Sequence, residues 1–316
     1  MDKQKKLNVI GQLCLLAAIT VWGSSFVILK ETIKTVPSLF VIAVRFLLST
    51  AVLSLVFIKK VRAMRLKTFL HGALIGLVLS FAYFFQTKGL ENTTPARNAF
   101  LTSSYCVMCP FIIWGMFKKK PKLKNLIAAV MAIVGIGFVA LSGDSGTGEN
   151  TLLGDGLTII CAVFYALQIV FIDHFQKNGE DGIQLLIPEL LVVGVVFAVA
   201  TLAFELPVCG IQGYALNLDQ LLKIGYLTFF CTLFAQGVQI IGQKYTTSAQ
   251  SSIILSGEAV FGVLFSVIVG YESLSIWLIV GFIILFVAMI ITELDGVSFG
   301  KNKKLGGDIS PKNKGE

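Results

Sequence analysis

Long apolar runs alternate with short polar segments along the whole chain. Each run approaches the roughly 20 residues that a helix needs to cross the hydrocarbon core of a bilayer. The runs lack the strict alternation of barrel strands, and in lipid only helices and closed barrels satisfy every backbone group. The pattern predicts an all-α integral membrane protein with ten transmembrane helices, at residues 8–29, 38–58, 68–88, 96–117, 123–142, 154–174, 184–204, 222–243, 248–270 and 274–294.

Two parts of this pattern occur twice. Residues 89–110 align without a gap with residues 242–263, and residues 11–22 are similar to residues 154–165. In the longer match, Ser103 lies over Ser256. These internal similarities indicate that the chain arose by duplication.

The duplication predicts two five-helix repeats, at residues 8–142 and 154–294, joined by a Gly-rich linker at 143–150. Because each repeat crosses the membrane an odd number of times, the second is expected to be inverted relative to the first. This arrangement is common among secondary transporters. The polar tail at 295–316 is rich in Lys and Gly and is expected to be disordered in the cytoplasm.

Composition and charge agree with this prediction. The chain is 55% hydrophobic and 14% charged with a mean hydropathy of +0.83, whereas soluble domains average about a quarter charged residues. With both termini in the cytoplasm, twenty basic residues fall on the cytoplasmic side of the cell membrane and five outside, as expected when Lys and Arg set the orientation. The net charge of +8 therefore comes from basic residues on the cytoplasmic side, which set the orientation and contact anionic lipid. It does not require a nucleic-acid partner.

Polar side chains within the spans predict a central site, because in lipid they are costly unless they face the interior of the bundle. Asn98, Thr102 and Tyr105 share one face of the fourth span at i, i+4 and i+7. The predicted substrate-binding residues are Trp22, Ser25, Tyr83, Gln86, Asn98, Thr102, Tyr105, Tyr165, Gln168, Gln236, Gln239 and Ser251. The alternatives are that Gln residues join helices, that Ser and Thr bond their own backbone, and that the Trp packs.

Glu258 differs from these residues because an ionised carboxylate near mid-bilayer costs a few kcal/mol. Such a group must be paired, protonated or in contact with water. We predict that Glu258 carries a coupling proton; the alternative is a structural carboxyl group hydrogen-bonded to Gln or Tyr neighbours. Arg45 is expected either to extend towards the outer surface or to pair with an acidic group. Glu189 follows Pro188 and is expected to cap a helix start.

Other motifs indicate packing rather than chemistry. Gly72 and Gly76 are four residues apart and predict a close approach of two helices. Cys106 and Cys109 have CxxC spacing, but they lie in an apolar helix without further ligands nearby in sequence. We therefore expect no metal and no cofactor. The chain lacks the Gly-x4-Gly-Lys-Ser/Thr phosphate loop, which excludes nucleotide-driven transport within this chain.

Several short motifs, in their order and spacing, resemble the drug/metabolite transporter superfamily, in its ten-span branch of two EamA-type repeats. They are Trp22-Gly23-Ser24-Ser25-Phe26, Arg45-Phe46, Thr94-Pro95-Ala96-Arg97-Asn98-Ala99, Gly154-Asp155, Gly257-Glu258-Ala259-Val260-Phe261 and Tyr271-Glu272-Ser273-Leu274. The resemblance implies a cavity at a pseudo-twofold axis, lined by helices 1, 3, 4, 6, 8 and 9. The family usually has Leu-Glu-Pro where this chain has Gly257-Glu258-Ala259, which predicts a straighter ninth helix.

The predicted function is secondary active transport of small organic solutes, such as amino acids, amines or related metabolites, by alternating access and coupled to a proton gradient. Export is the direction that the resemblance favours. The alternative is an integral membrane enzyme acting on a lipid-linked substrate, but the sequence shows no cluster of carboxylates, His or a nucleophile at a membrane surface. A receptor or scaffold would need larger loops or an added domain. We therefore expect a transporter and not an enzyme, with solute, lipid and a proton as partners.

Overall fold

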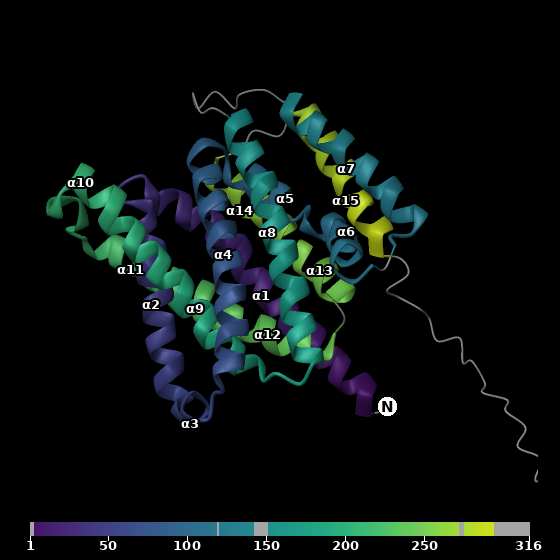
Figure 1. The fold of residues 1–316 in the computed structure, drawn as a ribbon. Coiled ribbons are helices and arrows are strands. Elements are labelled where there is room, and N and C mark those ends of the chain that lie inside the picture. Colours follow the sequence, from purple (N-terminus) through teal and green to yellow (C-terminus); the bar gives the residue numbers. More distant parts are fainter. Residues whose placement is uncertain (1–2, 119, 142–150, 247, 272–274, 294–316) are drawn as a thin grey trace, which may run out of the picture.

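The computed structural model describes residues 3–118, 120–141, 151–246, 248–271 and 275–293, and every regular element in these ranges is a helix (Figure 1). The predicted linker at 143–150 and tail at 295–316 lie outside the described residues. The longest helices are α1 (Lys3–Ile33), α2 (Ser38–Val56), α4 (Leu66–Asn92), α7 (Leu123–Leu141), α8 (Thr151–Lys177), α9 (Gly182–Ala200) and α15 (Ile276–Glu293).

Seven helical stretches of the described residues are long and apolar enough to cross a membrane. They are Lys6–Ile33, Ser38–Val56, Leu66–Asn92, Pro95–Phe117, Leu152–Lys177, Gly182–Cys209 and Leu218–Tyr245. Three shorter apolar helices, Leu126–Gly135, Ile254–Val269 and Ile276–Ala288, lie where the fifth, ninth and tenth spans are predicted. The prediction of a multi-pass helical membrane protein is therefore confirmed.

The predicted fourth and ninth spans are both interrupted. The fourth consists of α5 (Pro95–Thr102) and α6 (Tyr105–Phe117), and the ninth of α13 (Ser248–Ser256) and α14 (Glu258–Val269). The prediction of a straighter ninth helix is wrong, because the chain breaks at Gly257. The N–H of Gly257 donates to the carbonyl oxygen of Ile254 (3.1 Å), the tighter 3₁₀ pattern, and glycine is a weak helix former.

The predicted seventh and eighth spans contain wider helical turns. α9 continues through the π-helical η1 (Thr201–Glu205) into α10 (Leu206–Cys209). In the eighth span, α11 (Leu218–Tyr226) leads into the π-helical η3 (Leu227–Phe234) and then α12 (Ala235–Tyr245). π-Helical turns are uncommon and occur frequently at functional sites.

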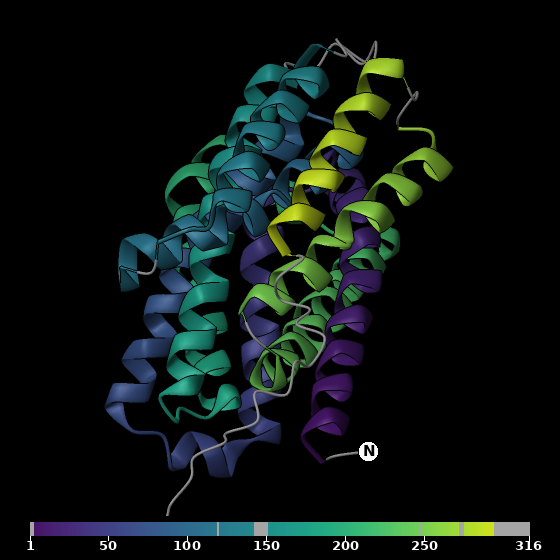
Figure 2. The ribbon, with the colours of Figure 1, turned by 90° about the vertical axis from the view of Figure 1, so that its right-hand side faces the viewer.

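Helices from the two halves of the chain pack closely against each other. The main pairs are α4 with α8 and α9, α1 with α12 and α14, and α2 with α9, while α7 and α15 form a pair at one side of the bundle (Figures 1 and 2). The expected close approach at the Gly72 and Gly76 positions is confirmed. A Cβ atom at Gly72 would meet the carbonyl oxygen of Leu185, and one at Gly76 that of Glu189. These glycines allow α4 and α9 to touch through their backbones.

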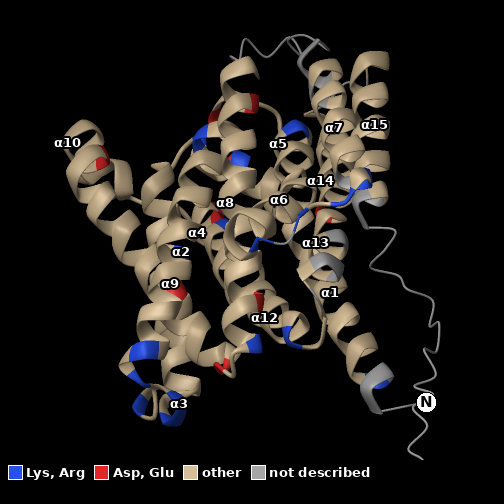
Figure 3. Cartoon of the chain, turned by 45° about the vertical axis from the view of Figure 1, so that its right-hand side comes forward, with Lys and Arg blue, Asp and Glu red and all other residues tan. Residues whose placement is uncertain are grey.

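Lys30 and Arg97 are buried in the protein. The Nζ atom of Lys30 donates to the carbonyl oxygens of Leu90 (2.7 Å) and Thr93 (3.0 Å) and so closes the C-terminal end of α4. Arg97, on α5, forms an ion pair with Asp155, on α8, and both side chains are buried. By contrast, the basic residues of α3 (Ile58–Arg62) gather at one end of the bundle (Figure 3).

Candidate functional site

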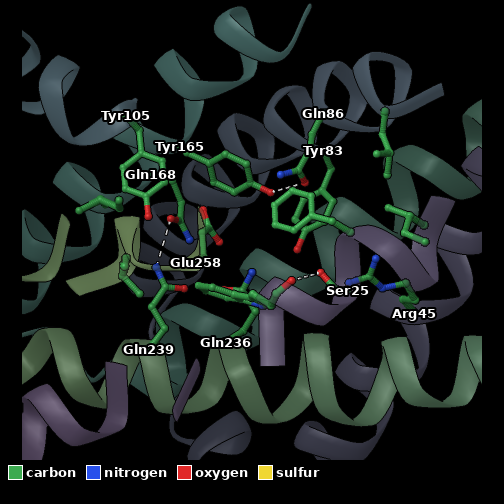
Figure 4. A pocket seen from close by; sticks show the side chains of 16 residues that line it. Ser25, Arg45, Tyr83, Gln86, Tyr105, Tyr165, Gln168, Gln236, Gln239 and Glu258 are labelled. Carbon is green, nitrogen blue, oxygen red and sulfur yellow. Dashed lines mark hydrogen bonds between the residues drawn. The ribbon is translucent and has the colours of Figure 1, made fainter. Parts of the chain in front are cut away.

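Side chains from eight helical segments enclose a cavity in the middle of the bundle. The space free of protein atoms within it, including the part open to solvent, is about 590 Å³. Ten of the thirteen predicted site residues line it: Trp22, Ser25, Tyr83, Gln86, Tyr105, Tyr165, Gln168, Gln236, Gln239 and Glu258 (Figure 4). Phe26, Leu29, Leu90, Ile169 and Leu255 add apolar walls that the polar pattern could not reveal.

The other three predicted residues lie outside this lining. The amide Nδ2 of Asn98 donates to the hydroxyl of Thr158 (2.7 Å) and to the carbonyl oxygen of Gln86 (3.1 Å), which joins α5 to α8 and α4. Thr102 accepts a hydrogen bond from Gln86 (3.4 Å). Ser251 shares a hydrogen bond with Thr246 (2.7 Å). The spacing of Asn98, Thr102 and Tyr105 predicts one continuous helical face. The break after Thr102 instead leaves Asn98 and Thr102 on α5 and Tyr105 on α6.

Glu258 is the first residue of α14 and faces the cavity with only 6% of its surface exposed. The hydroxyl groups of Tyr105 and Ser103 interact with its carboxyl group. No cation of the described residues forms an ion pair with Glu258. Its position in the first turn of α14 favours negative charge, since the N-terminus of a helix carries partial positive charge.

Glutamines and tyrosines form the polar wall beside Glu258. The Tyr165 hydroxyl donates to Oε1 of Gln86 (2.9 Å), and the Tyr165 ring lies 6.0 Å from that of Tyr83 and 6.3 Å from that of Tyr105. Nε2 of Gln239 donates to Oε1 of Gln168 (3.5 Å). These Gln and Tyr side chains carry no formal charge, and they offer hydroxyl and amide groups to a ligand.

Gln168 also connects the cavity to Glu189, which is fully buried on α9. Nε2 of Gln168 donates to Oε1 of Glu189 (2.8 Å), while the other carboxyl oxygen, Oε2, is buried without a partner in the described residues. The expectation that Glu189 caps a helix is wrong. Asp181 caps α9, because its Oδ1 accepts from the N–H groups of Ile183 (3.0 Å) and Gln184 (3.1 Å).

The π-helical segment η3 supplies hydrogen-bond acceptors to α1 and α2. Nε1 of Trp22 donates to the carbonyl oxygen of Cys231 (2.7 Å), and the Ser49 hydroxyl donates to the carbonyl oxygen of Thr228 (3.2 Å). An indole N–H in a buried setting needs such a partner. The bond to Cys231 fixes the indole ring of Trp22 in the cavity wall.

Arg45, on α2, is a lining residue that the predicted set leaves out. Its Nε donates to Oγ1 of Thr232 (3.1 Å), and the guanidinium carbon lies 5.6 Å from the ring centre of Tyr83. The side chain is 2% exposed and lines the cavity, so it does not extend to the outer surface. Nor does it pair with an acidic group of the described residues. Both alternatives expected for Arg45 are therefore wrong.

Comparison with known proteins agrees with this geometry. The sequence profile described as "EamA-like transporter family" matches twice, at residues 9–141 and 152–294. The chain belongs to the EamA-like transporter family. It is a multi-pass membrane transporter, and this family membership implies a small-molecule solute and contact with membrane lipid.

Two similar proteins of Archaeoglobus fulgidus are both described as "Uncharacterized transporter". One is 31% identical over 274 residues, which cover 87% of this chain and 82% of that protein. The other is 23% identical over 237 residues, covering 72% of this chain and 78% of that protein. A crystal structure with 17% identity has a similar fold, with a TM-score of 0.64, and the match covers 90% of this chain and 98% of that one.

Proposed function

We propose that this EamA-family member is a secondary active transporter that moves small organic solutes, such as amino acids, amines or related metabolites, through the central cavity by alternating access. Transport is coupled to a proton gradient, and the direction is export, as the family resemblance favours. The observation that carries the proposal is Glu258, a carboxyl group that faces the cavity without a cationic partner in the described residues. Such a group avoids the cost of burial by binding a proton or a cationic solute.

The proposal includes ten spans in two inverted repeats, at residues 8–142 and 154–294. It is supported by the way in which helix contacts recur when the halves are exchanged. α1 and α8 begin the two halves, and α4 and α12 belong to the third span of each half. Exchanging the halves therefore turns the pair α1 and α12 into the pair α8 and α4, and both pairs are in contact. The pairs α2 with α9 and α7 with α15 join equivalent helices of the two halves. Such a contact pattern is expected for two related bundles around a pseudo-twofold axis.

The aligned breaks at the ends of α5 and α13 support alternating access. α6 begins at Tyr105 and α14 at Glu258, which are equivalent positions in the internal alignment. Discontinuous helices whose ends meet at a site near the bilayer midplane are a recurring feature of secondary transporters. Each break gives one half of the protein a place at which a helix can bend around the bound solute.

The basic end of the bundle supports a cytoplasmic location for both termini. Lys59, Lys60 and Arg62 of α3 lie at the same end as the start of α1 (Figures 1 and 3). Basic residues accumulate on the cytoplasmic side of membrane proteins. With ten spans, the C-terminal tail returns to this same side.

The test is transport by purified protein reconstituted into liposomes, with a panel of amino acids and amines and an imposed pH gradient. We expect at least one solute to accumulate against its gradient, and Glu258→Gln to abolish the dependence on the pH gradient. Asp219→Asn is the matched control, since Asp219 is an exposed carboxylate paired with Lys223 (2.7 Å) outside the cavity. Gradient-driven transport by Glu258→Gln equal to the unmodified protein would overturn the role of Glu258.

A further inference from the structure

Arg45 is a buried cation whose charge the described residues do not neutralise. Its Nε bonds the Thr232 hydroxyl, but neither Nη atom makes a hydrogen bond within the described residues. Its guanidinium lies 5.6 Å from the ring centre of Tyr83 and 5.9 Å from that of Phe46. Cation–π contacts stabilise a desolvated cation. Burying an unpaired ion costs several kcal/mol, so these rings offset only part of the cost.

Among the described residues that line the cavity, Arg45 is the one basic side chain and Glu258 the one acidic side chain, and the two lie apart from each other. Figure 4 places Arg45 beside Ser25 at one end, and Glu258 close to Gln168 and Gln239 towards the other. The two residues form no ion pair. A fixed cation and a fixed carboxylate facing one cavity leave each site open to a ligand group of opposite charge.

We infer that Arg45 is the anion-binding end of the substrate site, so that the cavity takes solutes that carry a carboxylate as well as an ammonium group. The carboxylate binds the free Nη groups of Arg45, and the ammonium group binds Glu258. This inference rests on the proposed transport function and decides between amino acids and simple amines. A guanidinium fork suits a carboxylate because it can donate two parallel hydrogen bonds.

The surrounding residues fit this arrangement. Tyr83 and Gln236 lie between the two charged ends (Figure 4) and offer a hydroxyl and an amide to the middle of the solute. Thr232 holds the guanidinium at Nε and leaves the two Nη groups for the ligand. α2 is not among the helices that the family resemblance assigns to the cavity, so Arg45 adds a contact from an unexpected helix.

The test compares matched ligands that differ by one charge. The twenty standard amino acids are screened for binding to the purified full chain in detergent by thermal shift. Those that bind are compared with the decarboxylated amine and the N-acetyl derivative. We expect the amino acid to bind about tenfold or more tightly than either singly charged counterpart, since hydrogen bonds to ionised groups are the stronger ones. Binding of no amino acid, or equal binding of the amine, would overturn the inference.

Variants assign each charge to its residue. Arg45→Gln should remove the preference for the amino acid over its amine and keep the preference over the N-acetyl derivative, whereas Glu258→Gln should do the reverse. Arg45→Lys keeps a cation and should retain part of the preference. Lys223→Gln, outside the cavity, is the control and should leave both preferences unchanged. If Arg45→Gln weakens all three ligands equally, Arg45 has a structural role and the inference fails.

The proposed transport function can be separated from this inference by the same panel in liposomes. Gradient-driven transport of amines, with no binding of amino acids, would leave the transporter proposal standing and refute the anion-binding role of Arg45. Binding of amino acids in detergent, without transport of any solute in liposomes, would refute the transporter proposal and leave the anion-binding role of Arg45 standing.

Discussion

Arg45 and Glu189 occupy the same position in two 19-residue helices that pack against each other. Arg45 lies seven residues after the first residue of α2, and Glu189 lies seven residues after the first residue of α9. Both are buried, and neither forms an ion pair within the described residues. Arg45 reaches the cavity directly and Glu189 through Gln168. If the halves are repeats, these equivalent positions carry a basic residue in one half and an acidic residue in the other, which makes the two sides of the cavity unequal.

Replacing Glu189 with Gln tests whether the carboxyl group is needed as an acid. The Gln side chain can keep the acceptor for Gln168, places an amide NH2 group where the carboxyl oxygen without a partner in the described residues lies, and cannot carry a negative charge. We expect the free energy of unfolding to stay the same or to rise by up to about 1 kcal/mol. The thermal midpoint in detergent should therefore stay the same or rise. Coupling to the pH gradient should persist in liposomes. Loss of coupling in this variant would assign the proton to Glu189 instead of Glu258.

Asp155→Asn should be strongly destabilising. The change leaves the buried Arg97 guanidinium without its carboxylate, and breaking a buried pair costs about 3–5 kcal/mol. The same exchange at the exposed Asp219, which pairs with Lys223, should cost about 0.5 kcal/mol or less. Thermal unfolding in detergent compares the two variants. Equal small effects would show that the Arg97–Asp155 pair does not hold α5 against α8.

Hydropathy alone predicts a multi-pass helical membrane protein, because the cost of unpaired backbone groups in lipid leaves helices as the solution for long apolar runs. It does not predict where those helices break. Ser103 and Ser104 interrupt the fourth span and Gly257 the ninth, although hydropathy predicts one continuous helix for each span. A break depends on local hydrogen bonds three residues apart, such as Gly257 to Ile254, which leave no trace in hydropathy.

Polar positions predict most of the cavity lining for the same energetic reason. Gln236 and Gln239 line the cavity, as the spacing predicts. Asn98 does not, because Thr158 and the Gln86 backbone satisfy its amide between helices. The sequence cannot distinguish these outcomes, since both give a buried amide. The predicted set omits Arg45. Helical periodicity shows which residues share a face of one helix, but for a single charged residue it does not show which neighbouring helix or cavity that face meets.

Gly76→Ala tests the backbone contact between α4 and α9. The added Cβ atom would meet the carbonyl oxygen of Glu189 and the side chain of Val192, so one helix must shift. Overpacking of this kind costs about 1–3 kcal/mol. Gly237→Ala is the control, because a Cβ atom added there would have no neighbour within 4 Å, and helix propensity should stabilise this variant by up to about 1 kcal/mol. Thermal midpoints that move in the same direction would contradict the close-contact role of Gly76.

Asp181 links the loop before α9 to the basic helix α3, and its effect on stability should depend on pH. Partial burial acts to raise the pKa of Asp181, but the hydrogen bonds from Lys60 and from the N–H groups of Gln184 and Ile183 outweigh it and lower the pKa. The folded-state pKa therefore lies below that of the unfolded chain. The stabilisation is fully present above the unfolded value and is lost as the pH falls through the folded value.

Asp181→Ala should cost about 0.5–2 kcal/mol at neutral pH, the usual range for loss of an N-cap. Asp181→Asn keeps a capping oxygen and removes the ion pair with Lys60, so it should cost less. Thermal midpoints of the three proteins between pH 7 and strongly acidic pH provide the measurement. The gap between the unmodified protein and Asp181→Asn should be constant above the ordinary Asp range and close below it, because protonation removes the same charge. A gap that widened on acidification would mean that the carboxylate opposes folding and that the Lys60 contact does not stabilise the start of α9.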